Sequence, residues 1–297
     1  MQLFGIILII LSATSFGAIP IFAHFAYASG ATPLTVLFFR FAIAAVCFCT
    51  YLVIRQIPLP NPKNLRTLIL LGGVGFVLQS LSFFFALTVA SPGLVVLLLY
   101  LYPTIVVGIS IVVLHRPSSP GTLWALSLAL LGTVLTIGPV GNAQLLGVIL
   151  GLVSACIYAT YILVGEQVMT QESPITASTV VLTSAAVVYG GIVTIRGVSL
   201  PQDASGWLAI GALGLISTVV AIGALFTGIK LLGASTASML STLEPVVTIA
   251  LSLVILKQPI TGMQLVGGAL ILLAVIFLTV RKTAHDKSER DSYIEPQ

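Results

Sequence analysis

The amino-acid sequence predicts an all-α membrane protein, with ten transmembrane helices that use nearly the whole chain. Of its 297 residues, 58% are hydrophobic and only 7% are charged, whereas a soluble domain carries about 25% charged residues. The mean hydropathy is +1.17. The apolar residues are grouped into ten runs, each close to the ~20 residues that span a ~30 Å hydrocarbon core. Lipid is the solvent that suits such a surface.

The ten apolar runs are continuous and apolar all round, which excludes the short alternating segments of a membrane β-barrel. Backbone groups in lipid must be satisfied within their own segment, so each run is predicted to be a helix. Short connections rich in Pro, Gly, Asn and Ser make consecutive helices antiparallel neighbours. The runs cover residues 4–26, 33–54, 67–87, 92–113, 121–138, 144–165, 174–196, 207–228, 233–256 and 261–281.

The basic residues predict the orientation of these helices. With the N-terminus in the cytoplasm, nine of the twelve Lys and Arg residues fall on the cytoplasmic side, and Arg196 and Lys257 fall on the opposite side. The remaining one, Arg40, lies within a span. Cytoplasmic loops carry an excess of Lys and Arg. Both termini are therefore predicted to be cytoplasmic, with residues 282–297 as a polar tail.

An internal repeat aligns the two halves of the chain at a constant shift of 142 residues. Residues 3–13 and 145–155 are identical at six of eleven positions. Matched apolar residues carry little weight, but prolines and glycines are uncommon, and one unbroken shift pairs Pro103, Pro117 and Gly72 with Pro245, Pro259 and Gly214. Five helices per copy is an odd number, so the second copy enters the membrane from the opposite side. The predicted units are residues 1–140 and 143–281, as two inverted five-helix repeats.

The sequence resembles the drug/metabolite transporter superfamily, specifically its ten-helix EamA-type exporters, over residues 1–281. The motifs that carry the resemblance are Leu101-Tyr102-Pro103 and Leu243-Glu244-Pro245 in the two fourth helices, Phe39-Arg40-Phe41 in the second helix, and the short turns at 86–92 and 228–234. One feature departs from the family. A Glu often follows the fourth helix there, whereas this chain has His115-Arg116 and Lys257-Gln258, so no role of that Glu is transferred.

Within this family the chain looks most like bacterial amino-acid exporters of the YddG kind. The resemblance implies a multi-pass exporter of the bacterial inner membrane, with a cavity between the two halves. Helices 1, 3, 4, 6, 8 and 9 would line the cavity, and helices 5 and 10 would be peripheral.

Catalytic signatures are missing from the sequence. It contains no H-E-x-x-H, no G-x-S-x-G, no Walker A loop and no pair of intramembrane carboxylates. The three cysteines have no metal-ligand spacing. We therefore expect neither an enzyme, nor a cofactor, nor a metal site.

Glu244 is the only acidic residue near the middle of a predicted span, and its partner in the repeat is Tyr102. Ionisable residues at this depth are costly and are by default functional candidates. The alternative is a structural carboxyl that bonds backbone groups freed by Pro245. For Arg40, snorkelling to the interface or pairing with a neighbouring helix is favoured over substrate contact.

Polar and aromatic side chains inside the spans supply the remaining cavity candidates, since Tyr offers both an apolar face and a hydroxyl. Prolines in mid-span remove a backbone donor and are candidate hinges. The predicted substrate-binding residues are Glu244, Tyr102, Gln79, Tyr100, Tyr158, Tyr161, Ser12 and Ser154, and the predicted hinges are Pro103, Pro245 and Pro20.

Together these features predict a secondary-type transporter that exports small metabolites, with amino acids as the first choice, by alternating access. The alternatives are efflux of drugs or cationic compounds, and a membrane sensor that transports nothing. The expected partners are a small-molecule substrate and the lipid bilayer. The basic residues form no patch interleaved with exposed aromatics, so nucleic acid is not expected. A monomer is the assembly considered, and the sequence does not reveal the oligomeric state.

The predicted orientation can be tested by labelling single cysteines with a membrane-impermeant reagent. A cysteine at Lys63 should be labelled only from the cytoplasmic side and one at Ala31 only from outside, because the charge asymmetry orients the spans this way. Labelling of both positions from the same side would contradict the topology.

Overall fold

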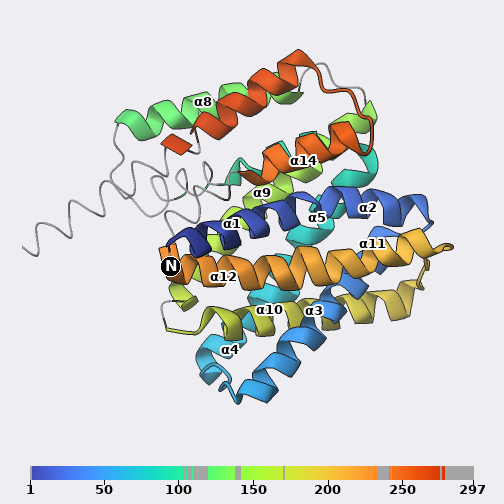
Figure 1. Cartoon of the computed structure of the whole chain (residues 1–297), viewed down its shortest axis with the longest axis vertical. Coiled ribbons are helices and arrows are strands. Elements are labelled where there is room, and N and C mark those ends of the chain that lie inside the picture. Colours follow the sequence, from blue (N-terminus) through green and yellow to red (C-terminus); the bar gives the residue numbers. More distant parts are fainter. Residues whose placement is uncertain are drawn as a thin grey trace, which may run out of the picture.

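The computed structural model describes residues 2–102, 120–137, 142–169, 171–232 and 243–274, with positions 105, 109, 241, 276 and 277. The predicted tail lies outside this part. All regular elements in the described part are helices (Figure 1). Five of them are long and apolar enough to cross a membrane: Leu3–Ala28, Pro33–Arg55, Pro62–Val89, Ile175–Arg196 and Ala204–Leu225. The total of ten spans and the cytoplasmic termini stay predictions.

The helices follow the order in which the apolar runs occur in the sequence. The first half contains α1 (Gln2–Gly17), α2 (Ile19–Ala28), α3 (Pro33–Arg55), α4 (Pro62–Leu70), the π-helical η1 (Leu71–Phe76), α5 (Val77–Val89), α6 (Pro92–Leu99) and α8 (Pro120–Ile137). The second half contains α9 (Asn142–Met169), α10 (Pro174–Arg196), α11 (Ala204–Gly214), the π-helical η2 (Leu215–Val220), α12 (Ala221–Leu232), α14 (Leu243–Val254) and a last helix, Gly262–Ala274.

The first predicted helix is interrupted where the sequence has a proline. The chain turns at Ala18 and the helix resumes as α2, with Pro20 within its first two positions. A proline ring clashes with the turn before it and cannot donate the hydrogen bond of that turn. The first helix is therefore interrupted next to Pro20, whereas the predicted role of Pro20 as a hinge stays a prediction.

The third helix of each half begins earlier than hydropathy predicted, at Pro62 and Ala204 instead of 67 and 207. Each has a polar N-cap that hydropathy does not detect. The side chain of Asn61 accepts from the backbone N–H of Asn64, and that of Asp203 accepts from Gly206, both at 2.9 Å. Such caps satisfy orphan donors of the first turn. The two caps are 142 residues apart in the sequence.

A π-helical segment occurs near the middle of the third helix in each half, at η1 and η2. π-Bulges are rare and are frequent at functional sites. Of the paired glycines of the repeat, Gly72 lies within η1 and Gly214 directly precedes η2, and another helix approaches each of them closely. A Cβ on Gly72 would overlap the backbone of Val181, and a Cβ on Gly214 would lie 2.8 Å from Ile43. Both glycines thus permit contact between the two halves.

The halves contact each other reciprocally. α1 packs on α12 and α14, and its repeat counterpart α9 packs on α5 and α6. α3 packs on α11, and α10 packs on η1; α3 and α10 also pack on each other, with α4 nearby (Figure 1). Each contact from a helix of the first half to a helix of the second half is thus matched by a contact between the two repeat counterparts. Such matched contacts are typical of an interface between two-fold-related units.

Two polar contacts, which we call the clasps, join a turn of one half to the third helix of the other. In the first clasp the Asn64 amide donates to Glu172 (2.7 Å) and Gln171 (3.3 Å). In the second clasp the Ser29 hydroxyl donates to Asp203 (2.9 Å), and the Ser29 carbonyl accepts from the backbone N–H of Gln202 (2.8 Å). Gln171 and Asp203 are the repeat counterparts of Ser29 and Asn61. The same joint is thus built twice.

The structure changes the choice of labelling position on the predicted outer side. Ala31 is only 5% exposed, whereas Val198, in the loop between α10 and α11, is 44% exposed. Val198 is predicted to face the same side as Ala31, so a cysteine there is the better partner for Lys63 in the labelling experiment.

The close approach at η1 predicts a strong effect of a single methyl group. Gly72→Ala should lower the free energy of unfolding by about 1–3 kcal/mol, because the backbone of Val181 cannot move aside as a flexible side chain could. Gly191→Ala is the control, since a Cβ on Gly191 meets nothing within 4 Å. Thermal unfolding in detergent measures both, and equal stability of the two variants would refute the close-contact account.

Candidate functional site

Glu244 lies in the first turn of α14, ten residues before the end of that helix at Val254. At ~1.5 Å per residue the distance to that end is about 15 Å, half the thickness of a ~30 Å hydrocarbon core. The depth of Glu244 near the midplane stays a prediction. The side chain is half-buried.

The Glu244 carboxylate joins the two halves through a hydrogen bond. The hydroxyl of Tyr100, which follows α6, lies 2.9 Å from its Oε2 atom and 3.0 Å from the carbonyl oxygen of Ser241. The Thr248 hydroxyl donates to the carbonyl of Gly17 at 2.8 Å and so fixes α14 against α1. Glu244 and Tyr100, both predicted as substrate-binding residues, are therefore direct neighbours.

Four predicted tyrosines form one continuous row. The ring centroids of Tyr100 and Tyr102 are 6.1 Å apart, those of Tyr102 and Tyr158 are 4.7 Å apart, and those of Tyr158 and Tyr161 are 5.9 Å apart. Phe76 of η1 extends the row at 5.5 Å from Tyr161. The row begins at the carboxylate of Glu244 and crosses from the end of α6 to α9. It combines aromatic faces with hydroxyl groups next to one acidic side chain.

The other polar candidates link helices in this conformation. The Ser12 hydroxyl donates to the carbonyl of Ala221 at 2.8 Å, and the Ser154 hydroxyl lies 3.2 Å from the carbonyl of Gln79. Ala221 and Gln79 are again 142 residues apart, so the two bonds are repeat counterparts. The Gln79 amide also donates to Ser154 at 3.0 Å. These residues hold α1 on α12 and α9 on α5, and a cavity-lining role remains a prediction.

Arg40 is buried and pairs with a neighbouring helix, one of the interpretations favoured by the sequence. Its Nε atom donates to the Thr218 hydroxyl of η2 at 2.9 Å. The guanidinium carbon lies 5.2 Å from the ring centroid of Phe41 and 5.4 Å from that of Phe84. Sequence reasoning missed Thr218, since a single hydroxyl within an apolar run gives no signal of its own.

The predicted hinges are only partly described. Pro20 is buried at the start of α2. Pro103 lies outside the described residues, and Pro245 is described only as a backbone position within α14. Within the described part, no group of three His, Cys, Asp or Glu side chains could hold a metal ion.

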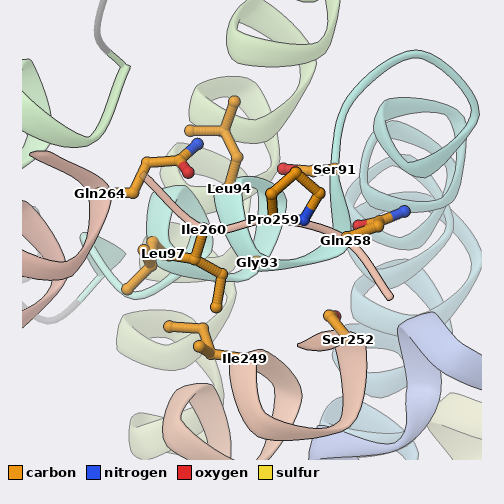
Figure 2. A pocket seen from close by; sticks show the side chains of 10 residues that line it. All are labelled: Ser91, Gly93, Leu94, Leu97, Ile249, Ser252, Gln258, Pro259, Ile260 and Gln264. Atoms are coloured by element: carbon orange, nitrogen blue, oxygen red, sulfur yellow. The ribbon is translucent and has the colours of Figure 1, made fainter. Parts of the chain in front are cut away.

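A small pocket lies between the start of α6 and the end of α14 (Figure 2). Its empty volume is about 360 Å³, including space open to the outside. Leu94, Leu97 and Ile249 form much of its apolar wall. The Ser252 hydroxyl and the Gln258 side-chain oxygen are buried without a hydrogen-bond partner. The pocket is thus another place where the halves meet, on the predicted outer side.

The Gln79–Ser154 contact predicts non-additive effects on stability. Ser154→Ala should lower the free energy of unfolding by about 1–3 kcal/mol, because it leaves the buried Gln79 amide without its acceptor. Adding Gln79→Leu should recover part of that loss, since both polar partners are then gone. Thr160→Ala is the control, because the exposed Thr160 bonds only its own helix. Its free energy of unfolding should stay within about 0.5 kcal/mol of the wild-type value. Additive losses in this double-mutant cycle, measured by thermal unfolding, would contradict the coupling.

Comparison with known proteins agrees with this architecture. The model of the EamA-like transporter family matches twice, at residues 3–138 and 145–280, two segments offset by the same 142 residues. The chain also superposes on a crystal structure with a TM-score of 0.63 and 20% sequence identity. The superposition covers 94% of this chain and 96% of the other chain. That likeness concerns the fold alone.

Relatives of known sequence are transporters by name. The chain is 26% identical over 298 residues to an uncharacterized transporter of Bacillus subtilis, YcbK, covering 96% of each protein. It is 28% identical over 278 residues to an uncharacterized transporter of Archaeoglobus fulgidus, covering 92% of this chain and 95% of that protein. These names match a transporter rather than an enzyme. The protein is a multi-pass membrane transporter of the inner (plasma) membrane, and it belongs to the EamA-like transporter family.

Proposed function

We propose that this protein exports small metabolites, with amino acids as the first choice, by alternating access and without a nucleotide site of its own. The observation that carries the proposal is the contact between Glu244 and Tyr100 near the midplane. Through this contact Glu244, which is predicted to lie deep in the membrane, bonds a residue of the other half, and this supports a site between the halves. Substrate sites of secondary transporters lie at this depth, at the interface between repeats.

The chemistry of this contact suits an amphipathic amine. An ionised Glu244 attracts a substrate ammonium group, and the tyrosine row beside it offers aromatic faces and hydroxyls for a side chain. A substrate ammonium that binds Glu244 would replace the Tyr100 hydroxyl as its partner. Binding would then weaken a bond that holds α6 to α14, which couples occupancy to separation of the halves.

The distribution of contacts supports rocking on one side of the molecule. On the side of α3 and α10, stacking of Phe41 on Tyr189 and both clasps join the halves. At the start of α6 the contact is apolar, with Gly93 facing Ile249, and a pocket lies beside it. We infer that α3 and α10 stay together while α6 and α14 separate, a movement of packed units about a hinge. The reciprocal packing supports inverted repeats for residues 1–140 and 143–281.

Efflux of organic cations is the second candidate, favoured by the same pairing of a carboxylate with aromatic faces. A cation without a carboxylate would use Glu244 and the tyrosine row alone. A non-transporting sensor is the remaining alternative from the sequence. Flux measurements decide between these functions, because only transport moves a labelled compound across a sealed membrane.

The function is tested with purified protein in proteoliposomes. Radiolabelled amino acids should exchange across the membrane, and Glu244→Gln should lower exchange at least ~tenfold, because the amide keeps the shape but loses the charge. Normal stability of the variant in detergent is the control. Exchange retained in Glu244→Gln but lost in Glu244→Ala would instead assign Glu244 a structural role. Movement of organic cations without any amino acid would favour the second candidate.

The rocking side is tested by reversible cross-linking in a variant without native cysteines. A cross-link at Asn64/Glu172 or at Ser29/Asp203 should change transport less than about twofold, whereas one at Gly93/Ile249 should reduce it at least ~tenfold. The reason is that only the last pair joins surfaces proposed to separate. Recovery after reduction controls for damage. Loss of transport on cross-linking either clasp would refute this arrangement.

A further inference from the structure

Arg40 is a cation enclosed by the helices. It lies seven residues after Pro33, about 10 Å along α3 at ~1.5 Å per residue, and is 6% exposed. Its Nε atom donates to Thr218, and its terminal nitrogens make no hydrogen bond to any residue that the structure describes. Among the described residues, no carboxylate lies within salt-bridge distance of Arg40. A charged side chain within a span is costly unless it is paired.

The surroundings orient the guanidinium without neutralising it. The Thr218 hydroxyl donates to the carbonyl of Leu213 at 2.8 Å, so a lone pair remains for the Arg40 Nε–H. That Thr218–Leu213 bond spans five residues at η2, where the helix is π-helical. Phe41 and Phe84 lie against the planar group. These contacts occupy one edge of the guanidinium and hold the group in place.

The neighbouring hydroxyls have other partners. The Tyr27 hydroxyl donates to the carbonyl of Phe84 at 3.0 Å, and the Tyr189 hydroxyl lies 2.9 Å from both Ser80 Oγ and the Val77 carbonyl. Glu244 is close enough to interact electrostatically with Arg40, but its carboxylate is bonded to Tyr100. Within the described part of the protein, the guanidinium therefore has no anion within hydrogen-bond or salt-bridge distance.

We propose that Arg40 binds the carboxylate of the transported molecule, opposite Glu244, which receives its amino group. A guanidinium presents paired N–H groups that match a carboxylate. The site then recognises both charged ends of a zwitterion and leaves the side chain to the tyrosine row. Arg40 lies about 10 Å from the start of α3, and Glu244 lies about 15 Å from the end of α14. Both of these helix ends are predicted to face the outer side, so the two side chains are at similar predicted depths. This inference rests on the proposed function, because it names the recognition element for amino acids.

The test compares amino acids with their own carboxamides, which keep the ammonium and the side chain but lose the carboxylate charge. Leucine, phenylalanine and lysine, each with its carboxamide, serve as probes for exchange in proteoliposomes. Wild-type protein should move at least one amino acid at least ~tenfold faster than its amide, since a site built around a polar group rejects an analogue that lacks it. Arg40→Gln should lower the ratio of amino-acid exchange to amide exchange by a similar factor, and Arg40→Lys should give an intermediate ratio.

Each outcome separates the inference from the function on which it rests. Equal rates for acid and amide in the wild type, with a ratio unchanged in Arg40→Lys, would overturn the role of Arg40 while amino-acid transport stands. Transport of none of the six compounds would overturn both. If Arg40→Gln does not fold, the wild-type ratio and Arg40→Lys still decide. A purely structural Arg40 would lower both exchanges together, which also contradicts the proposal.

Discussion

Lipid offers no hydrogen bonds, and this constraint determines which polar contacts the protein can keep. Every backbone group within the hydrocarbon must be satisfied by the protein, which makes the chain helical wherever it is apolar. Side-chain hydroxyls and amides face the same demand, and several of the described ones meet it by bonding to another helix. Ser12, Ser154 and Gln79 do so across the two halves. Polar groups act here as connectors, because helices gain little from apolar association in a solvent that is itself apolar.

The connectors are distributed reciprocally, and this has a mechanical consequence. A bond from α1 to α12 has its counterpart from α9 to α5, and the clasp at Asn64 has its counterpart at Ser29. The counterparts are not identical. One clasp uses the Asn64 amide, whereas the equivalent position near the other clasp is Gly206, where a Cβ would overlap Ser29. Under the proposed alternating access, related halves with unequal joints would have two similar but distinguishable arrangements, as a transport cycle requires.

Arg40, which is buried, and Glu244, which is half-buried, differ in how many of their polar atoms the protein bonds. Glu244 has a hydroxyl donor from the opposite half, and Arg40 has one hydroxyl acceptor and two aromatic faces. Neither has a partner of opposite charge within salt-bridge distance in the described part. Unpaired charges at this depth are unfavourable. A ligand with one positive and one negative group would therefore stabilise the protein by pairing with Glu244 and Arg40. The remaining groups of the site are neutral, which restricts charge recognition to these two positions.

Much of the fold was predictable from the sequence, because lipid imposes the length, apolarity and helicity of each span. The sequence also marked Pro20 as a candidate hinge and paired Gly72 with Gly214 through the constant shift of 142, whereas the close approach at these glycines was seen only in the structure. The starts of α4 and α11 were placed too late, since their first turns are polar and are capped by Asn61 and Asp203. Hydropathy registers only apolar length and does not detect a cap.

The candidate site was predictable only in part. Glu244 was recognisable in the sequence as a lone carboxylate at mid-span, and the tyrosines as amphipathic side chains. That Tyr100 meets Glu244, that four tyrosines form one row, and that Arg40 meets Thr218 depend on how helices from different halves pack. In a uniformly apolar helix, the sequence has no periodic pattern that would indicate which face packs on which neighbouring helix. The sequence by itself therefore determined the helices and their duplication, whereas the tertiary packing decided which polar side chains meet.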